Sequence, residues 1–218
     1  MRILSVNVGL PRDNPWKDEP EFTGIDKRPV AGPVAVTAPG PKGDGGVGLA
    51  GDRVGDVKHH GGSLQAVYAY SREDYDHFEA MLGRELRAGV FGENLTTEGH
   101  DLSEARVGER WSGPSGLVLE VTCPRTPCGT FRGWMDVRGW LRTFTREARP
   151  GTYLRVVEPE TVEQGDELEV VERPDHEVTI AKYFKAAMGE RDLIPEILEA
   201  GVLDAEEEKF LLSRYGGS

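Results

Sequence analysis

Residues 48–70 read GLAGDRVGDVKHHGGSLQAVYAY, and this stretch constrains the fold and function of the chain more than any other. Its first part is rich in glycine and charge, whereas Gln65 to Tyr70 form an apolar run that favours a buried strand. Glycines let successive backbone N–H groups approach an anion closely, and Lys58, His59 and His60 would add charge and hydrogen-bond donors. The stretch therefore predicts an anion-binding loop that leads directly into a core strand.

The charged residues of this loop admit other interpretations. Asp52 and Asp56 could be paired acids, although orienting the loop or pairing with Arg53 or Lys58 explains them better. The two histidines could simply bond backbone carbonyls. The loop is not a Walker A motif because the Gly-Lys-Ser/Thr ending is missing, and a Ser–His–Asp hydrolase is disfavoured because no nucleophile elbow is present.

A second stretch, LVLEVTCPRTPCG at residues 117–129, carries the two cysteines of the chain. Its alternating pattern predicts a strand over 117–123 that ends at Pro124. Cys123 falls on the same face of this strand as three aliphatic residues. We therefore expect Cys123 to be a small buried side chain with no chemical role.

Cys128 lies in a different local environment. Thr126-Pro127 is typical of a helix N-cap followed by proline at the first helical position, which puts Cys128 in the first turn. The positive end of such a helix, together with Arg125, favours a thiolate. A zinc site is disfavoured because no second cysteine pair exists, and a disulfide to Cys123 is disfavoured by the tight loop. Cys128 is therefore the candidate reactive or metal-ligating thiol.

The remaining pattern predicts a mainly β body. Further strands are expected at 2–8, 24–38, 153–157 and 167–171. Pro29 and Pro33 should push the strand at 24–38 to an edge or a bulge. Ser71 and Gly83 are typical of the two ends of a helix, and a short helix is expected around Trp140.

The composition changes at Arg173-Pro174. Beyond this point apolar residues recur at helical spacing in three short segments. The chain is therefore expected to divide into a β domain at 1–173 and a three-helix extension at 174–218. So small an extension is not stable alone, so it should pack on the β body or on a partner.

Composition excludes some classes of function. The net charge of −12 disfavours nonspecific nucleic-acid binding, which needs a basic surface. No apolar run approaches the roughly 20 residues that span a bilayer, so we expect no membrane association. The start of the chain is typical of a first strand and not of a signal peptide. Two cysteines without a targeting segment fit a reducing cytoplasm.

Several motifs together indicate a family. GLAGDRVGDVKHHGGSLQAVYAY, then FGENL at 91–95 and PRTPC at 124–128, resemble the MOSC domain, and in particular its YiiM-like subgroup. The upstream segment GIDKRPVAGPV and the last 40 or so residues are also similar to that subgroup, so the resemblance covers nearly the whole chain. The loop at 39–46 looks longer than the usual connection.

The resemblance implies a β-barrel core with peripheral helices that binds the molybdenum cofactor, a pyranopterin phosphate whose dithiolene holds molybdenum. Cys128 matches the cysteine that ligates the metal in the family. The family is also associated with pyridoxal phosphate binding. The residues expected to bind the cofactor are Asp52, Arg53, Asp56, Lys58, His59, His60, Gly61, Gly62 and Arg125.

By analogy with its YiiM-like relatives, the chain would be an oxidoreductase that reduces N-hydroxylated compounds, such as hydroxylaminopurines, to amines. A soft thiolate suits molybdenum, and His59 or His60 could deliver a proton because imidazole changes charge near neutral pH. Electrons would come from an external reductase or ferredoxin-like protein, since no flavin, haem or iron–sulfur motif is found. A homodimer is compatible with the sequence.

Two other functions remain open. Cys128 could carry a persulfide or deliver the cofactor without turnover, although no fused desulfurase domain is present. Alternatively, the C-terminal helices could dock a partner while the β body stays inert.

Overall fold

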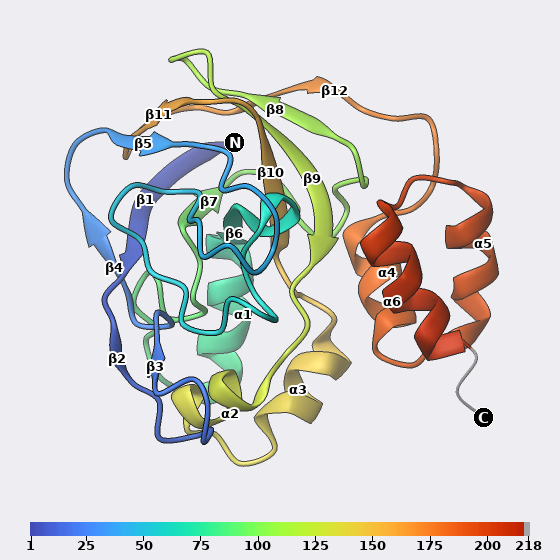
Figure 1. The fold of residues 1–218 in the computed structure, drawn as a ribbon, viewed down its shortest axis with the longest axis horizontal. Coiled ribbons are helices and arrows are strands. Elements are labelled where there is room, and N and C mark those ends of the chain that lie inside the picture. Colours follow the sequence, from blue (N-terminus) through green and yellow to red (C-terminus); the bar gives the residue numbers. More distant parts are fainter. Residues whose placement is uncertain (216–218) are drawn as a thin grey trace.

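The computed structural model describes the backbone of residues 1–215 and the side chains of residues 1–214. One mixed sheet, in the order β12-β8-β9-β10-β6-β7-β1-β4, forms the body, and two short antiparallel pairs, β11-β5 and β2-β3, accompany it (Figure 1). The strands are β1 (Arg2–Gly9), β2 (Arg12–Asp13), β3 (Phe22–Thr23), β4 (Lys27–Val30), β5 (Val34–Val36), β6 (Val67–Ser71), β7 (Leu95–Glu98), β8 (Arg110–Ser112), β9 (Val118–Pro124), β10 (Thr152–Glu158), β11 (Glu160–Val162) and β12 (Glu169–Glu172).

The helices are α1 (Arg72–Leu82), α2 (Gly129–Met135), α3 (Trp140–Glu147), α4 (Ile180–Ala187), α5 (Ile194–Glu199) and α6 (Ala205–Tyr215), with short 3-10 turns at η1 (Ser63–Gln65) and η2 (Arg191–Leu193). Helices α1, α2 and α3 share one hydrophobic cluster, and the remaining helices lie beside the end of strand β9 (Figure 1). None of the helices in the described part of the chain is long and apolar enough to cross a membrane.

The expected barrel is not closed, and the prediction was wrong on this point. Strands β12 and β4 are the two edges of the sheet and do not pair with each other. The start of β1 meets the segment before β12 through an isolated bridge at Arg2 and Glu167 and through hydrogen bonds that join Met1 and Ile3 to the backbone of residues 165–168. The edge position of β4 was predicted correctly, because Pro29 has no N–H to donate to a further strand.

The single strand predicted over 24–38 is instead two strands in different sheets. Strand β4 pairs with β1, whereas β5 pairs with β11. Gly32 lies between them with φ of 76°, a left-handed conformation that breaks an extended chain.

Two of the predicted helix starts can be compared with the structure. Ser71 is the N-cap of α1, where its hydroxyl accepts from the Asp74 N–H at 3.1 Å, and Gly83 ends the helix in a left-handed conformation, as expected. Helix α2 begins later than predicted. Its N-cap is Cys128, not Thr126, because Cys128 keeps an extended backbone with φ of −122° and ψ of 173°.

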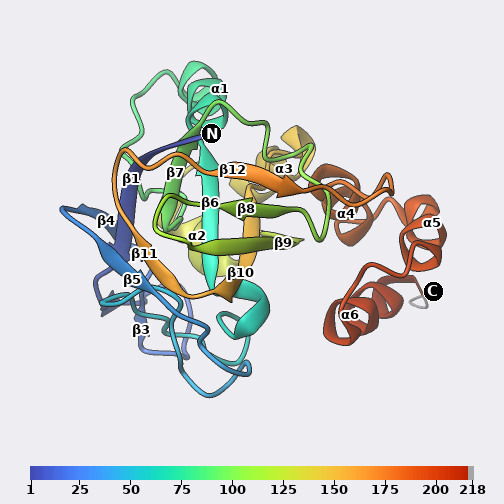
Figure 2. The same ribbon diagram turned by 90° about the horizontal axis from the view of Figure 1, so that it is seen from above.

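The C-terminal helices pack on the β body. Val178, Ile180 and Tyr183 are fully buried or nearly so, in the same hydrophobic cluster as Leu119 and Val121 of β9. A second cluster, mostly aromatic, fills the space between α1, α2 and α3. Figures 1 and 2 both place α4, α5 and α6 together beside the end of β9, as a lobe at one side of the molecule.

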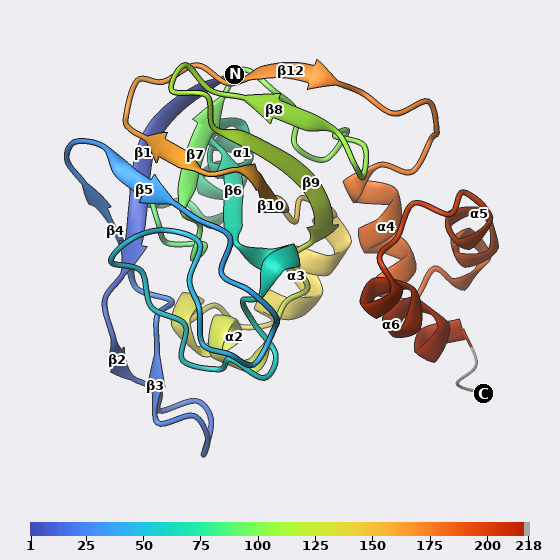
Figure 3. The ribbon, with the colours of Figure 1, turned by 45° about the horizontal axis from the view of Figure 1, so that its top comes forward.

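The segment between β5 and β6 contains the glycine-rich loop and lies at the same end of the molecule as α2 (Figure 3). Gly62 closes this segment with φ of 77°. A Cβ at Gly62 would lie 2.7 Å from the Cα and N atoms of Lys42, which is too close for the two backbones to remain in place. Glycine is therefore required at position 62 by conformation and by space.

We predict that Gly62→Ala lowers the free energy of unfolding by about 1–3 kcal/mol, through left-handed strain and through displacement of Lys42. Gly40→Ala is the matched control, because Gly40 has φ of 80° but no atom within 4 Å of the added Cβ. Urea denaturation of the two variants measures the difference. Equal losses in both would show that the close approach to Lys42 contributes nothing.

Candidate functional site

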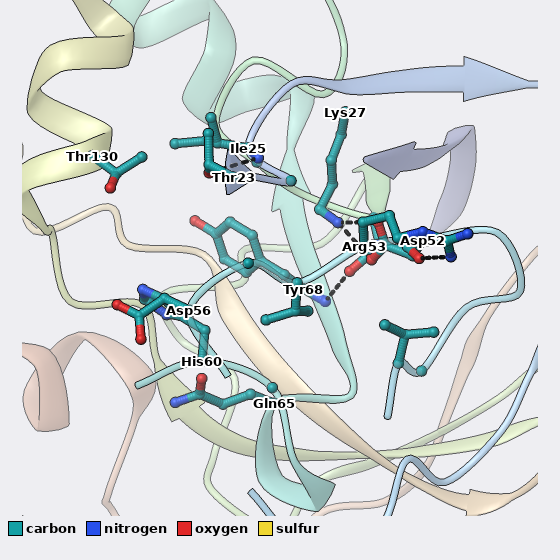
Figure 4. Close-up of a pocket in the computed structure, with 18 of the residues that line it drawn as sticks. Thr23, Ile25, Lys27, Asp52, Arg53, Asp56, His60, Gln65, Tyr68 and Thr130 are labelled. Carbon is teal, nitrogen blue, oxygen red and sulfur yellow. Dashed lines mark hydrogen bonds and ion pairs between the residues drawn. The ribbon is translucent and has the colours of Figure 1, made fainter. Parts of the chain in front are cut away.

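A cavity of about 850 Å³, partly open to solvent, lies where the glycine-rich loop faces β6, the FGENL turn and α2. Figure 4 shows Tyr68 between two groups of polar side chains, with Lys27, Asp52 and Arg53 on one side and His60 and Gln65 on the other. Segments far apart in the sequence therefore contribute to one cavity, which we call the first cavity.

Asp52 anchors the loop to the sheet. Its carboxylate accepts two hydrogen bonds of 2.6 Å from the Lys27 ammonium group, one of 2.6 Å from the Gly9 N–H and one of 2.9 Å from the Asn94 side-chain amide. Asp52 and Lys27 are only 3% and 7% exposed, so this is a buried ion pair at the wall of the cavity. Of the two roles expected for the aspartates, Asp52 takes that of orienting the loop and not that of pairing with Arg53 or Lys58, and Arg53 instead donates to the Asp52 carbonyl.

Asp56 stabilises the other part of the loop. It accepts a hydrogen bond from Lys17 at 3.1 Å and interacts with the Nδ1 atom of His59 at 2.9 Å. Burial raises the pKa of Asp56, but the hydrogen bonds from His59 and Lys17 outweigh this effect and lower it below its usual value. Asp56 is thus a charged anchor that holds His59 away from the first cavity.

Cys128 reaches the first cavity as a thiolate. Burial raises the pKa of its thiol, but a hydrogen bond from His60 and the charge of Arg125 prevail and lower the pKa from about 9 to about 6. The sequence pointed to Arg125 and the helix end, whereas the contribution of His60 comes from tertiary contact. Of the two adjacent histidines, His60 is the one that lines this cavity.

Arg125 is buried with part of its guanidinium group unused. Its side chain is 7% exposed, and its Cζ atom lies 3.4 Å from the centre of the Phe131 ring. Its Nη1 atom is buried without a hydrogen-bond partner among the described residues. Because a buried charged donor without a partner is costly, this atom marks a place for an anionic or carbonyl group in the cavity.

The predicted site residues divide between two cavities. Those that line the first cavity are Asp52, Arg53, Asp56, His60, Gly61, Arg125 and Cys128. Lys58 and His59 instead line a second cavity beside the C-terminal helices, which also includes His60 and Cys128. Gly62 contributes by allowing the left-handed loop conformation described above.

The sequence did not identify several residues of the first cavity, including Lys27, Gln65, Tyr68, Asn94 and Thr130. The sequence patterns that could have indicated these residues were weak. Lys27 is a charge inside a strand-like segment, and Gln65 is a polar residue three positions after the glycine pair. Their place in the cavity depends on contacts between distant segments.

Cys123 is buried as predicted, at 2% exposure, and burial raises the pKa of its thiol well above the usual value. The two cysteines therefore differ in ionisation, although they are only five positions apart.

We predict that Asp52→Ala lowers the free energy of unfolding by about 3–5 kcal/mol, because it leaves the Lys27 ammonium group buried without a partner. Asp44→Ala, an exposed aspartate of the same inter-strand segment, should change stability by less than about 0.5 kcal/mol. Denaturant titration measures both. Restoration of stability in the Asp52→Leu/Lys27→Met double variant would identify the unpaired charge as the cause, and similar losses for Asp52→Ala and Asp44→Ala would contradict it.

We also predict that alkylation of Cys128 by iodoacetamide rises with pH through a midpoint near 6, since the thiolate is the reacting form. Cys123 in the same protein should remain unmodified in this range. His60→Ala should move the midpoint for Cys128 upward, because a donor to the thiolate is lost. Peptide mass spectrometry across pH 4–9 measures each thiol, and an unchanged midpoint in His60→Ala would rule out its role.

Comparisons with known proteins agree with this description. The MOSC domain model matches residues 56–169. An uncharacterized protein, YflK of Bacillus subtilis, is 30% identical over 178 residues, which cover 82% of this chain and 76% of the relative. A protein of Gibberella moniliformis named a reductase is 28% identical over 155 residues, which cover 70% of this chain but only 26% of that protein.

The crystal structure of YiiM from Geobacillus stearothermophilus is similar to this chain over its whole length. It covers 99% of both chains with a TM-score of 0.77 and 27% sequence identity. The open mixed sheet, the helices around it and the C-terminal helices are therefore a shared architecture. With the model match over more than half of its length, the chain belongs to the MOSC domain family.

Proposed function

We propose that this protein is a molybdenum-cofactor-dependent oxidoreductase that reduces N-hydroxylated compounds, of which hydroxylaminopurines are the model, to amines. The observation that carries the proposal is that the Cys128 thiolate and the unpaired Nη1 atom of Arg125 belong to one cavity. The naming of the Gibberella relative as a reductase supports an oxidoreductase.

The residues present fit the cofactor. A soft thiolate is a suitable ligand for molybdenum, and Arg125 offers a buried donor to an anionic or carbonyl group. Among the described residues, no group of three or more His, Cys, Asp and Glu side chains could hold a metal ion. A metal at Cys128 would therefore have to bring most of its ligands with it, as a dithiolene cofactor does.

Each residue of the site has a role in this proposal. Cys128 would ligate the metal, and Arg125 and Arg53 would hold the anionic cofactor. His60, hydrogen-bonded to the Cys128 thiolate, would keep a proton close to the reacting centre. Asp52 and Asp56 act through the loop, since both carboxylates are occupied by lysine partners.

The overall reaction balances as RNHOH plus two electrons and two protons giving RNH₂ plus water. The N–O bond breaks, and the hydroxyl leaves as water. When bound, the cofactor supplies the two-electron chemistry. The electrons are proposed to come from an external reductase or ferredoxin-like protein.

We predict that protein produced in a host that makes the molybdenum cofactor contains molybdenum and pterin in near-stoichiometric amounts, and that Cys128→Ala loses most of the molybdenum. Cys123→Ala is the matched control and should retain it, because the Cys123 thiol is buried and protonated. Elemental analysis and pterin fluorescence after oxidation measure the two contents. Full molybdenum in Cys128→Ala would contradict the assignment.

Turnover separates the reductase from a carrier. The loaded protein should reduce a hydroxylaminopurine with a chemical electron donor, and Cys128→Ala should not. Cofactor or persulfide bound to Cys128 without any reduction would favour the sulfur or cofactor carrier instead.

A further inference from the structure

A second cavity, of about 1080 Å³, lies between the glycine-rich loop and the C-terminal helices. Its walls come from the loop, the end of β9, α4 and α6. His60, Gln65 and Cys128 border both cavities, so the two spaces meet at the reactive thiolate. A molecule in the second cavity therefore lies next to the residues that also line the first cavity.

One side of this second cavity is cationic. It is lined by Lys17, Lys42 and Lys58, although the chain as a whole carries a net charge of −12. Lys17 is paired with Asp56, and Lys42 with Glu206. Lys58 has no ion-pair partner within residues 1–214. A free ammonium group at the rim of a cavity is suited to a phosphate.

The other side carries aromatic side chains. Phe210 of α6 and Tyr183 and Ala187 of α4 line it, together with Glu206 and Glu207. Glu206 is paired with Lys42, and burial raises the pKa of Glu207 despite its hydrogen bond with Tyr183. Gln65, at the junction, has a buried side-chain oxygen without a donor among the described residues. This oxygen could accept a hydrogen bond from an N–H or O–H group.

We propose that the second cavity binds the substrate, and that the substrate is an N-hydroxylated heterocycle that carries a phosphate, such as a nucleoside monophosphate. The phosphate contacts Lys58, the heterocycle lies against the aromatic side, and its N-hydroxyl group points to Gln65 at the junction with the first cavity, where Cys128 would hold the metal. This inference rests on the proposed reductase function and specifies its substrate class. Lys58 is thereby assigned to the substrate and not to the cofactor.

The same phosphate chemistry could come from the cofactor. Two observations favour the substrate. Lys58 does not line the first cavity, and that cavity has its own unsatisfied guanidinium at Arg125. A substitution of Lys58 distinguishes the two sources of phosphate. If Lys58 binds the substrate, the variant loses affinity for a nucleotide; if Lys58 binds the cofactor, the variant loses pterin.

The test is calorimetric binding of adenosine 5′-monophosphate and of adenosine to the purified, cofactor-loaded protein. We expect the monophosphate to bind at least about tenfold more tightly, and Lys58→Ala to remove about tenfold of that affinity without changing adenosine binding or pterin content. The preference should weaken as salt is raised. Lys185→Ala, which removes an exposed lysine of α4 outside this cavity, is the matched control and should change none of these values.

Equal binding of the two ligands, or no binding of either, would overturn the proposal. Loss of pterin in Lys58→Ala would also overturn it, because the subsite would then hold the cofactor. These outcomes are independent of the reductase assignment, which depends on the molybdenum content of Cys128→Ala. If that variant keeps its molybdenum while the nucleotide preference persists, the reductase proposal fails and the nucleotide site remains.

Discussion

The buried ion pair between Asp52 and Lys27 is the interaction on which the site depends. Burying two charges is costly unless both are fully hydrogen-bonded, and Asp52 meets this condition with partners from β1, β4 and the turn before β7. The same carboxylate thus fixes the glycine-rich loop against three distant segments. Asp52 and Asp56 hold the loop at two points, and the first cavity lies beside it. The part of the loop that carries His60 borders both cavities.

The thiolate of Cys128 lies at the boundary of two chemically different spaces. The first cavity offers a buried guanidinium and the lip of a glycine-rich loop, whereas the second offers lysines and the aromatic side of the C-terminal helices. In the arrangement we propose, the cofactor occupies the first cavity and the substrate the second, and they meet where both cavities border Cys128. The C-terminal extension then has a direct part in the site, because α4 and α6 form a wall of the second cavity. Its hydrophobic packing on β9 makes that wall part of the folded body.

Local patterns predicted much of the fold. Proline in β4 indicated an edge strand, and Ser71 and Gly83 marked the ends of α1, because each acts through its own backbone or its nearest neighbours. Closure of the sheet could not be predicted in this way. It depends on how far the strands curve and on whether β12 reaches β4, and no local pattern reports that distance. The late start of α2 has a similar origin, since Cys128 stays extended where its side chain meets His60.

By itself, the sequence determined which residues could do chemistry: a reactive Cys128 and an inert Cys123, a glycine-rich loop with two histidines, and the motifs that indicate the MOSC family. Only the tertiary structure decided how they are used. In the folded chain His60, and not His59, is the partner of the Cys128 thiolate. Asp52 pairs with Lys27, and Lys58 lines a separate cavity. The physical reason is that ionisation and pairing depend on burial and on charges within a few ångströms, and these neighbours come from segments far apart in the chain.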